Sequence, residues 1–545
     1  MRLHLTHPTG PAARPVKSLD TAARPDPSDT PSADTLIPPG RHGVADREPT
    51  RVPNRRCLIE TGRTVAFRHV LCVYPYRREL NAVGFFPPLG LEYIATTIEP
   101  YAEQIDVVDL RKESGRTSDF LRADTDLVCF SINWDRDAEF LREEIRSVPP
   151  GVLTIVGGRH ATENPEYWLS AFPGVDVLVR GDGEEVVEDL CRGLPLGEIA
   201  GLSFRRDGRI CHNPNRQSRP LTNDLYPNRT LRKYVYEVAI EGVSLGLPID
   251  TVSSSRGCPF NCAFCSFSRN PWGEKRRWSA RSPESVVEEL ARIDAPIVAF
   301  TDDLFTHDMA RVERICDLIL SRGIRKKFIV NARLEIARHP GILRRMEQAG
   351  FFMLLLGIES AHDKTLRSMG KGFNTAQIRE YFKVLRQSSM LLHGYFILGN
   401  IGESVEDMKQ ITPFAHELGI DSIALSLLRV GPYTGVEDLV AKSPGYHVAG
   451  NGKVYSDDCS VKELRRLRRR LYREFYSLKH VIRVMRKECW RGVGQYVGGL
   501  VWNLPRISWG LAMHYRRRSK RRARRRKMRH APRPTVKDGL QGVCS

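Results

Sequence analysis

The sequence lacks long hydrophobic runs and is poor in cysteine. No uninterrupted apolar stretch reaches about 18 residues, the length that a transmembrane helix needs, and the N-terminus has no apolar signal core. We therefore expect a cytoplasmic protein. With 12 cysteines in 545 residues, the chain is no small disulfide-rich scaffold, and thiolates that bind metal in a reducing compartment fit better.

Acidic residues are scarce only at the C-terminal end. Residues 461–545 contain 26 Lys and Arg against 4 Asp and Glu, whereas the first 460 residues contain 58 basic and 60 acidic residues. The net charge of +20 therefore comes from the tail, and a neutral body argues against nucleic acid as a partner. We expect helix 461–489 to pack on its own barrel. The aromatic and basic residues beyond it also suit contact with an anionic membrane surface.

The first half of the chain alternates between β-rich and helical segments. The β-rich runs are 70–74, 105–110, 127–131, 152–156 and 175–179. This order predicts an α/β fold whose N-terminal part is a Rossmann-like, five-stranded parallel sheet over residues 66–200. Ligands of such sheets bind at the carboxyl ends of the strands. Those ends carry Pro75, Ser131, Gly157, Gly158 and Gly181, although tight turns explain the glycines equally well.

A second series of strands and helices follows a connector at 201–250. Six βα units between 251 and 430 predict a partial (β/α)6 barrel, whose chemistry lies at the carboxyl ends of its strands. The remaining segments are a disordered leader at 1–65, a basic helical C-terminal extension at 431–515 and a basic disordered tail at 516–545.

Three cysteines follow the first predicted barrel strand. Cys258, Cys262 and Cys265 have C-x3-C-x2-C spacing, which chance explains poorly in a chain with so few cysteines. A zinc site would need a fourth ligand, and no Cys or His lies nearby in the sequence. Three thiolates can instead hold three irons of a [4Fe–4S] cluster and leave the fourth iron open.

This segment, with Phe264 before the third cysteine, resembles the radical S-adenosylmethionine (SAM) enzymes. The resemblance implies that the open iron binds the amino and carboxylate groups of SAM. It also implies that an electron donor such as flavodoxin or ferredoxin supplies the electron that generates a 5′-deoxyadenosyl radical.

Other predicted strand ends match the same family. The resemblance implies SAM contacts by Phe264, by Asp302 and Asp303 to the amino group, by Arg333 to the carboxylate, by Glu359 to the ribose and by Gly399 beside the adenine. Capping aspartates and an ordinary barrel ion pair remain alternatives for Asp302, Asp303 and Arg333.

The N-terminal half resembles the cobalamin-binding domain that is fused to one class of radical SAM proteins. The segments that carry the resemblance are 87–93, 157–162 and 180–185. The resemblance implies cobalamin contacts by Pro75, Ser131, Asn133, Gly157, Gly158, Gly181 and Glu184. The motif Asp-x-His-x-x-Gly, which supplies an axial His in other cobalamin domains, does not occur, and His160 is better explained as a structural residue.

The combination resembles the cobalamin-dependent radical SAM methyltransferases, and most closely the phosphinate P-methyltransferases of phosphinothricin biosynthesis. It implies transfer of a methyl group from SAM through methylcobalamin to an unactivated atom. An anionic substrate would need cations near the cluster, which Arg269, Lys275, Arg276 and Arg277 could supply, although a solvated loop is the simpler interpretation. The alternatives are C-methylation of another secondary metabolite and an oxidative cyclase that transfers no methyl group.

Overall fold

The computed structural model describes residues 64–77, 85–134, 137–240, 243–270 and 272–489. The predicted leader, apart from its last two residues, and the predicted tail lie outside these ranges. Both sheets described below belong to one compact unit of the chain. No helix among the described residues is long and apolar enough to cross a membrane.

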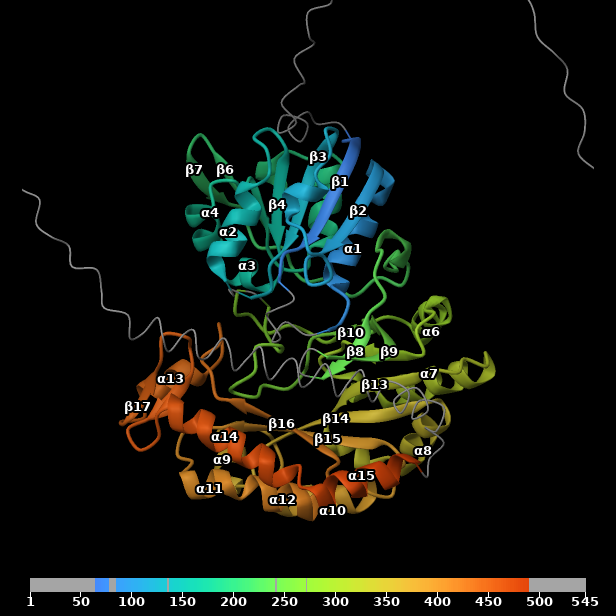
Figure 1. Ribbon diagram of the computed structural model, residues 1–545, viewed down its shortest axis with the longest axis vertical. Helices are drawn as coiled ribbons and strands as arrows, with labels where there is room; N and C mark the ends of the chain where they lie inside the picture. The colour runs from blue at the N-terminus through green and yellow to red at the C-terminus, as the bar shows by residue number, and fades with distance from the viewer. Residues whose placement is uncertain (1–63, 78–84, 135–136, 241–242, 271, 490–545) are drawn as a thin grey trace, which may run out of the picture. The chain divides into compact units, whose positions relative to one another are not determined.

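The N-terminal sheet has the predicted parallel core. Its strand order is β2-β1-β3-β4-β5-β6-β7 (Figure 1). The first five of these strands pair in parallel. They are β1 (Phe67–Tyr74), β2 (Ala102–Asp109), β3 (Thr125–Ser131), β4 (Leu153–Gly157) and β5 (Val177–Val179). Helices α1 (Leu89–Ile98), α2 (Ala138–Arg146), α3 (Arg159–Glu163), α4 (Pro165–Ala171) and α5 (Glu184–Cys191) cover the sheet.

The sheet continues into the segment that we expected to be a connector. Strands β6 (Leu202–Arg206) and β7 (Arg209–His212) add an antiparallel hairpin, which brings the sheet to seven strands. Asp207 and Gly208 form its turn with φ of 50° and 74°. Positive φ at both central residues is what a two-residue hairpin turn requires, and Asp-Gly is a preferred pair for it.

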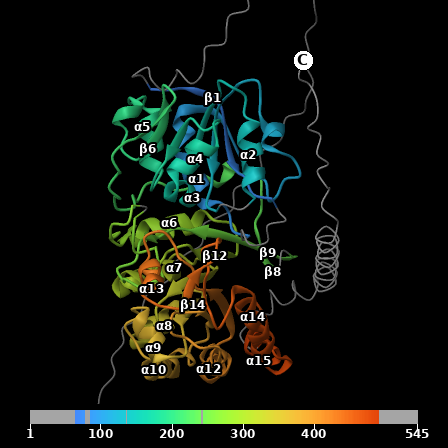
Figure 2. The ribbon, with the colours of Figure 1, turned by 90° about the vertical axis from the view of Figure 1, so that its left-hand side faces the viewer.

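The second sheet is a half-barrel. Its order is β16-β15-β14-β13-β12-β9-β8, with six parallel strands and β8 antiparallel at one edge. Four of these strands, β8, β9, β12 and β14, are labelled in Figure 2. The strands are β8 (Glu237–Ile240), β9 (Val243–Val252), β12 (Ile297–Phe300), β13 (Lys327–Ala332), β14 (Phe351–Glu359), β15 (Leu391–Leu398) and β16 (Ser422–Leu427). A short pair, β10 (Ser255–Arg256) and β11 (Ser279–Ala280), brackets the cysteine segment.

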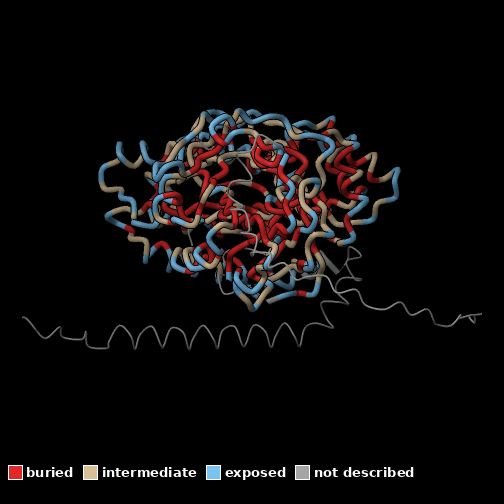
Figure 3. The backbone as a smooth tube through the Cα atoms, turned by 90° about the horizontal axis from the view of Figure 1, so that it is seen from above, coloured by how far each residue is buried: buried red, intermediate tan, exposed pale blue. Residues whose placement is uncertain are grey.

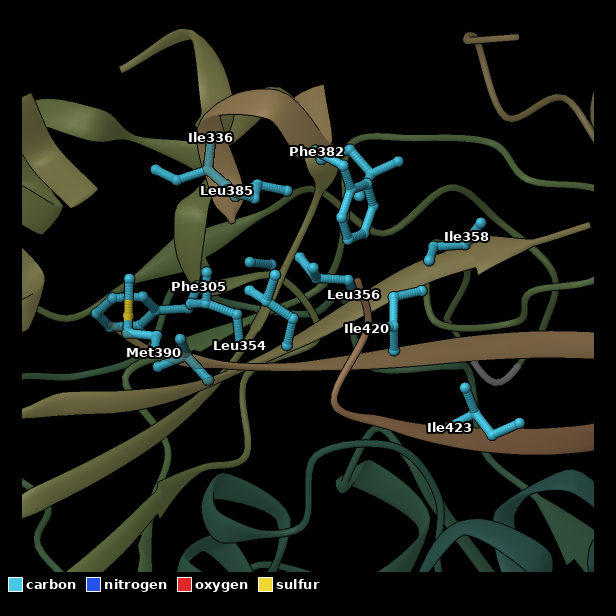
Figure 4. Close-up of a cluster of buried hydrophobic side chains, with 14 of the residues drawn as sticks. Phe305, Ile336, Leu354, Leu356, Ile358, Phe382, Leu385, Met390, Ile420 and Ile423 are labelled. Carbon is cyan, nitrogen blue, oxygen red and sulfur yellow. The ribbon is translucent and has the colours of Figure 1, made fainter. Parts of the chain in front are cut away.

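Helices cover the outer face of the half-barrel, and the hydrophobic core lies between these helices and the sheet. They are α6 (Pro283–Arg292), α7 (Met309–Ser321), α8 (Pro340–Gln348), α9 (Asp363–Ser368), α10 (Thr375–Leu385), α11 (Val405–Lys409) and α12 (Ile411–Leu418). Leu354, Leu356 and Ile358 alternate along β14 and point into this core beside Phe382 (Figure 4). The tube coloured by burial shows the buried segments inside the molecule and the exposed segments around them (Figure 3).

The C-terminal extension closes the free edge of the half-barrel. After α13 (Val436–Ala441) and the hairpin of β17 (Tyr446–Val448) and β18 (Val454–Ser456), the predicted helix divides into α14 (Val461–Phe475) and α15 (Leu478–Cys489). Leu464, Leu467, Leu471 and Phe475 of α14 are buried in the barrel core, as expected. Leu478 lies in the part of the predicted helix that we also expected to pack on the barrel, but it is 77% exposed, because the helix breaks before it.

Two tyrosines explain how α14 protects the edge strand. The backbone N–H groups of Ile423 and Leu425 on β16 donate to the hydroxyls of Tyr476 and Tyr472, at 3.0 and 2.9 Å. An edge strand without such partners would expose unpaired N–H groups to other chains.

Candidate active site

The cysteine segment is a loop directly after β10. The thiols of Cys258, Cys262 and Cys265 are unpaired and partly exposed, and the N–H of Cys265 donates to the carbonyl of Cys262 at 3.0 Å. Burial raises the pKa of the Cys258 thiol, and it raises the pKa of Cys265 to about 11. The neighbouring thiols act on both groups in the same direction, so the three sulfurs lie within electrostatic reach of one another.

The donor set fits an iron–sulfur cluster better than a single ion. Among the residues that the structure describes, no three His, Cys, Asp or Glu side chains converge on one metal position. A cubane binds each cysteine at a separate corner, so its ligands do not need to converge on a point. Three thiols in one loop are the donors that leave one iron open.

Contacts from distant parts of the barrel hold this loop. Gly257, with φ of 84°, donates its N–H to Asp303 Oδ2 at 2.8 Å. Ala263 donates to the carbonyl of Met369 and accepts from the N–H of Gly435, each at 3.0 Å. Phe264 packs in a small apolar cluster with Met369. The loop is therefore shaped by the barrel before any cluster binds.

The two aspartates after β12 have different surroundings. Asp302 is fully buried and accepts from the N–H and hydroxyl of Ser254, at 2.7 and 2.6 Å, and from the hydroxyl of Ser255. Three hydrogen bonds therefore hold its carboxylate inside the barrel, and the predicted contact with the SAM amino group stays a prediction for this residue. Asp303 is partly exposed beside the cysteine loop, and its predicted contact stays a prediction too.

Arg333 lies against the cysteine loop. Its guanidinium carbon is 3.6 Å from the ring centroid of Phe260, which stands between the first two cysteines. It also pairs with Glu335 at 2.8 Å and donates to the carbonyl of Lys371 at 2.7 Å. The structure thus shows the barrel ion pair that we kept as the alternative, at a position next to the cluster ligands.

Glu359 is held in a strained and buried position at the end of β14. Its φ is 75°, which is unusual for a residue with a side chain, and its Oε1 lies 3.3 Å from Nζ of Lys371. Burial raises the pKa of this carboxyl, although Lys371 opposes the shift. Sequence reasoning missed Lys371, whose ammonium is also 5.9 Å from the ring centroid of Phe264. Such strain is typical of functional sites.

Packing against α14 explains why position 399 is a glycine. Its φ is 77°, and an added Cβ would lie 3.0 Å from Cδ1 of Leu464 on α14. The missing side chain therefore makes room for α14. The predicted contact with adenine has no support from this geometry.

A cavity of about 310 Å³ opens at the carboxyl ends of the strands in the N-terminal sheet. This size lies at the lower end of the range for small-molecule sites, about 300–1,000 Å³. Six of the seven residues expected to contact cobalamin line it, namely Ser131, Asn133, Gly157, Gly158, Gly181 and Glu184. Pro75 does not line it, whereas the preceding Tyr74 does.

Backbone geometry explains the central glycine of this cavity. Gly158 has φ of 98°, and a Cβ there would lie 2.7 Å from the carbonyl oxygen of Ile132. The neighbouring His160 accepts a hydrogen bond on Nδ1 from Nε1 of Trp168 at 3.0 Å. The side chain is thus held against α4, in agreement with its interpretation as a structural residue.

The cavity and the cysteine loop share side chains. Arg256, two residues before Cys258, lines the cavity and pairs with Glu184. Arg276, after the loop, donates to Asp182 at 2.7 Å. Arg159 reaches Ser266, which follows Cys265. The two candidate cofactor sites are therefore adjacent.

The cations expected to bind an anionic substrate are not brought together. Arg276 is paired with Asp182, and Arg269 donates to the carbonyl of Gly273 at 2.8 Å. Lys275 and Arg277 are exposed. Arg159, which we did not predict, also extends from the cavity side to the cysteine loop, and it pairs with Glu163 at 2.9 Å.

Comparison with known protein families identifies two domains in this chain. Residues 252–415 match the model of the radical SAM superfamily, and residues 80–191 match the B12 binding domain. The cysteine loop lies inside the first match, and all six predicted residues in the cavity wall, at positions 131–184, lie inside the second. The chain is an enzyme that combines a B12-binding domain with a radical SAM domain.

The named relatives include methyltransferases and a cyclase. An uncharacterized methyltransferase of Pyrococcus horikoshii is 29% identical over 66% of this chain and 78% of its own length. Cytidylyl-2-hydroxyethylphosphonate methyltransferase of Streptomyces wedmorensis is 25% identical over 71% of this chain and 83% of its own length. The anaerobic magnesium-protoporphyrin IX monomethyl ester cyclase of Cereibacter sphaeroides is 26% identical, over 53% of this chain and 48% of the cyclase.

The fold agrees with a solved structure. The radical SAM methyltransferase TsrM from Kitasatospora setae, with cobalamin and a [4Fe–4S] cluster bound, superposes with a TM-score of 0.58 at 17% identity, over 74% of this chain and 91% of TsrM. Together with the domain matches, the relatives identify a cobalamin-dependent radical SAM methyltransferase. Its cofactors are a [4Fe–4S] cluster, SAM and cobalamin.

Proposed function

We propose that the enzyme methylates an unactivated atom of a small natural-product intermediate, and that this atom is the phosphorus of a phosphinate. One observation carries the general reaction. Arg256 belongs to the wall of the cobalamin cavity and to the segment that leads into Cys258, so the methyl donor and the radical source meet at one place.

The cofactors would supply a methyl group and a hydrogen-abstracting radical, which is what methylation of a non-nucleophilic atom requires. The chain supplies their positions. Cys258, Cys262 and Cys265 hold the cluster in a loop that the barrel has already shaped. Glu359 and Lys371 place one carboxylate and one ammonium beside that loop.

Two features support an anionic, phosphorus-containing substrate. The relative from Streptomyces wedmorensis is named for a phosphonate substrate and covers 71% of this chain. Arg159 has 40% of its side chain exposed. It follows Gly158 of the cavity wall and reaches Ser266 after the last cysteine, and it pairs with Glu163 at 2.9 Å. A guanidinium is well suited to bidentate binding of a phosphorus oxyanion.

The test is an anaerobic assay of the reconstituted enzyme with methyl-deuterated SAM, cobalamin, a reductant and a panel of phosphinates and phosphonates. We expect 5′-deoxyadenosine, S-adenosylhomocysteine and a product that is heavier by one labelled methyl group on phosphorus. A labelled methyl group on carbon would refute the phosphinate and retain the methyltransferase. Deoxyadenosine without mass gain would point to the cyclase reaction.

Two cysteine variants control the assay. Cys265→Ala is expected to abolish deoxyadenosine formation and to lower the iron content. Cys211→Ala removes a partly exposed thiol on β7, outside the loop, and is expected to leave both unchanged. Equal behaviour of the two variants would refute the assignment of the cluster ligands.

A further inference from the structure

The loop 181–184 of the B12-binding domain contacts both arms of the cysteine loop. On the N-terminal arm, Arg256 pairs with Glu184 and also with Asp182 at 3.4 Å. On the C-terminal arm, Arg276 pairs with Asp182 at 2.7 Å. An added Cβ on Gly181 would lie 3.4 Å from the ring of Trp272, so this ring packs closely against the backbone of Gly181.

These ion pairs are partly withdrawn from water. The side chains of Arg256 and Glu184 are 20% and 16% exposed, and those of Arg276 and Asp182 are 16% and 30% exposed. Charge pairs of this kind are screened less than surface pairs, so their geometry matters more to the free energy. Each acid has an arginine on the other domain as its partner.

The same residues form the wall of the cobalamin cavity. Gly181, Asp182, Glu184 and Arg256 all line it. A ligand in the cavity therefore contacts side chains that also fix the position of Cys258, which is two residues after Arg256. Conversely, a cluster on the cysteines restrains the arginines that hold the cavity wall.

We propose that Asp182 and Glu184, through Arg276 and Arg256, are positioning residues that couple cobalamin binding to assembly of the [4Fe–4S] cluster. Each cofactor then binds more tightly when the other is present. The coupling is reciprocal, because both equilibria share the same restrained loop. The inference depends on the two cofactor sites and not on the identity of the methyl acceptor, so the assay of the proposed function can fail without affecting it.

The experiment measures hydroxocobalamin binding to two forms of the full-length protein, one with the cluster reconstituted and one with the cluster removed by an iron chelator. Quenching of tryptophan fluorescence and the cobalamin absorbance retained after gel filtration report the affinity. Wild-type protein is expected to bind at least about fivefold more tightly with the cluster than without it, the lower end of typical coupling. The rate of iron loss to the chelator is expected to fall when cobalamin is bound.

The variants Asp182→Asn and Arg256→Gln are expected to bring this affinity ratio close to one. The exchanged pair, Glu184→Arg with Arg256→Glu, is expected to restore part of it. Glu284→Gln breaks an exposed ion pair with Arg314 on the barrel surface and serves as the matched control, with the wild-type ratio. Thermal melting of each apoprotein shows which variants fold.

A ratio of one in the wild-type protein overturns the proposal. So does an unchanged ratio in both Asp182→Asn and Arg276→Gln when both proteins fold. A loss of cobalamin affinity that is the same with and without the cluster would show that these residues contact cobalamin and transmit nothing to the cysteine loop.

Discussion

Replacing Lys371 with Met is expected to destabilise the barrel by about 3 kcal/mol near neutral pH. Lys371 and Glu359 have only 6% and 9% of their side chains exposed, and the two charges are 3.3 Å apart. Removing one partner of a buried pair costs about 3–5 kcal/mol, because the other charge stays buried without compensation. The separation is long for a charge-assisted contact, so the lower end of that range applies.

The loss is expected to shrink on acidification. Burial raises the pKa of Glu359 above its ordinary value of 4.5 even with Lys371 present. A carboxyl with a raised pKa contributes stability below its unfolded pKa and loses that contribution as the pH rises through the folded pKa. Without Lys371 the folded pKa rises further, so the variant loses least near pH 5 and most near pH 8.

The assay is chemical denaturation of the apoprotein, followed by circular dichroism at both pH values. The double variant Lys371→Met with Glu359→Gln is expected to recover most of the stability, since no charge is left buried. Lys383→Met breaks an exposed pair with Glu380 and is expected to leave the midpoint unchanged. A Lys371→Met midpoint that matches this control, or a double variant that recovers nothing, would refute the reasoning.

Three other predictions concern the second half of the chain. Burial raises the pKa of Glu403 to about 7, so its contribution to stability is present at low pH and lost as the pH rises through that value. The variant Glu403→Gln is expected to remove this pH dependence. Chemical denaturation between pH 5 and 8 measures it. Gly399→Ala places a side chain at positive φ and 3.0 Å from Leu464, and a loss of about 1–2 kcal/mol is expected, which an unchanged melting temperature would contradict. The exposed Leu478 and the basic residues beyond it are expected to bind anionic but not neutral lipid vesicles in a sedimentation assay, with loss of binding in high salt and on removal of 516–545.

The parallel strands could be predicted closely because they are buried on both faces. The runs expected at 127–131 and 152–156 are β3 and β4 with shifts of one or two residues. The first barrel strand begins at Val243, eight residues before the expected 251. Gly246 and Pro248 interrupt the apolar pattern there, and the antiparallel partner β8 compensates by pairing with this part of β9. The apolar pattern of residues 243–252 alone gives no sign of the pairing with β8, so the early start of β9 could not be predicted.

The site was predictable where spacing along the chain carries the chemistry. The three cysteines and the glycines of the cavity are of this kind. Lys371 and the role of Asp302 were not predictable, because their partners come from elsewhere in the chain. Ser254, 48 residues before Asp302, donates two hydrogen bonds to its carboxylate, and an Asp-Asp pair at a strand end gives no sign of this.

The segment expected to be a passive connector holds the two domains together. Arg232 pairs with Glu92 on α1 at 2.7 Å and also with Asp250 on β9. Arg229 pairs with Glu289 on α6 at 2.7 Å. Arg232, which follows a short 3-10 turn, thus joins the B12-binding domain to the barrel, and Arg229 within that turn fixes the connector to the barrel. Because these acids are almost fully buried, each arginine is needed to keep a buried carboxylate compensated. The relative position of the two cofactor sites therefore depends on charge pairs that span the chain, and a neutral composition conceals them.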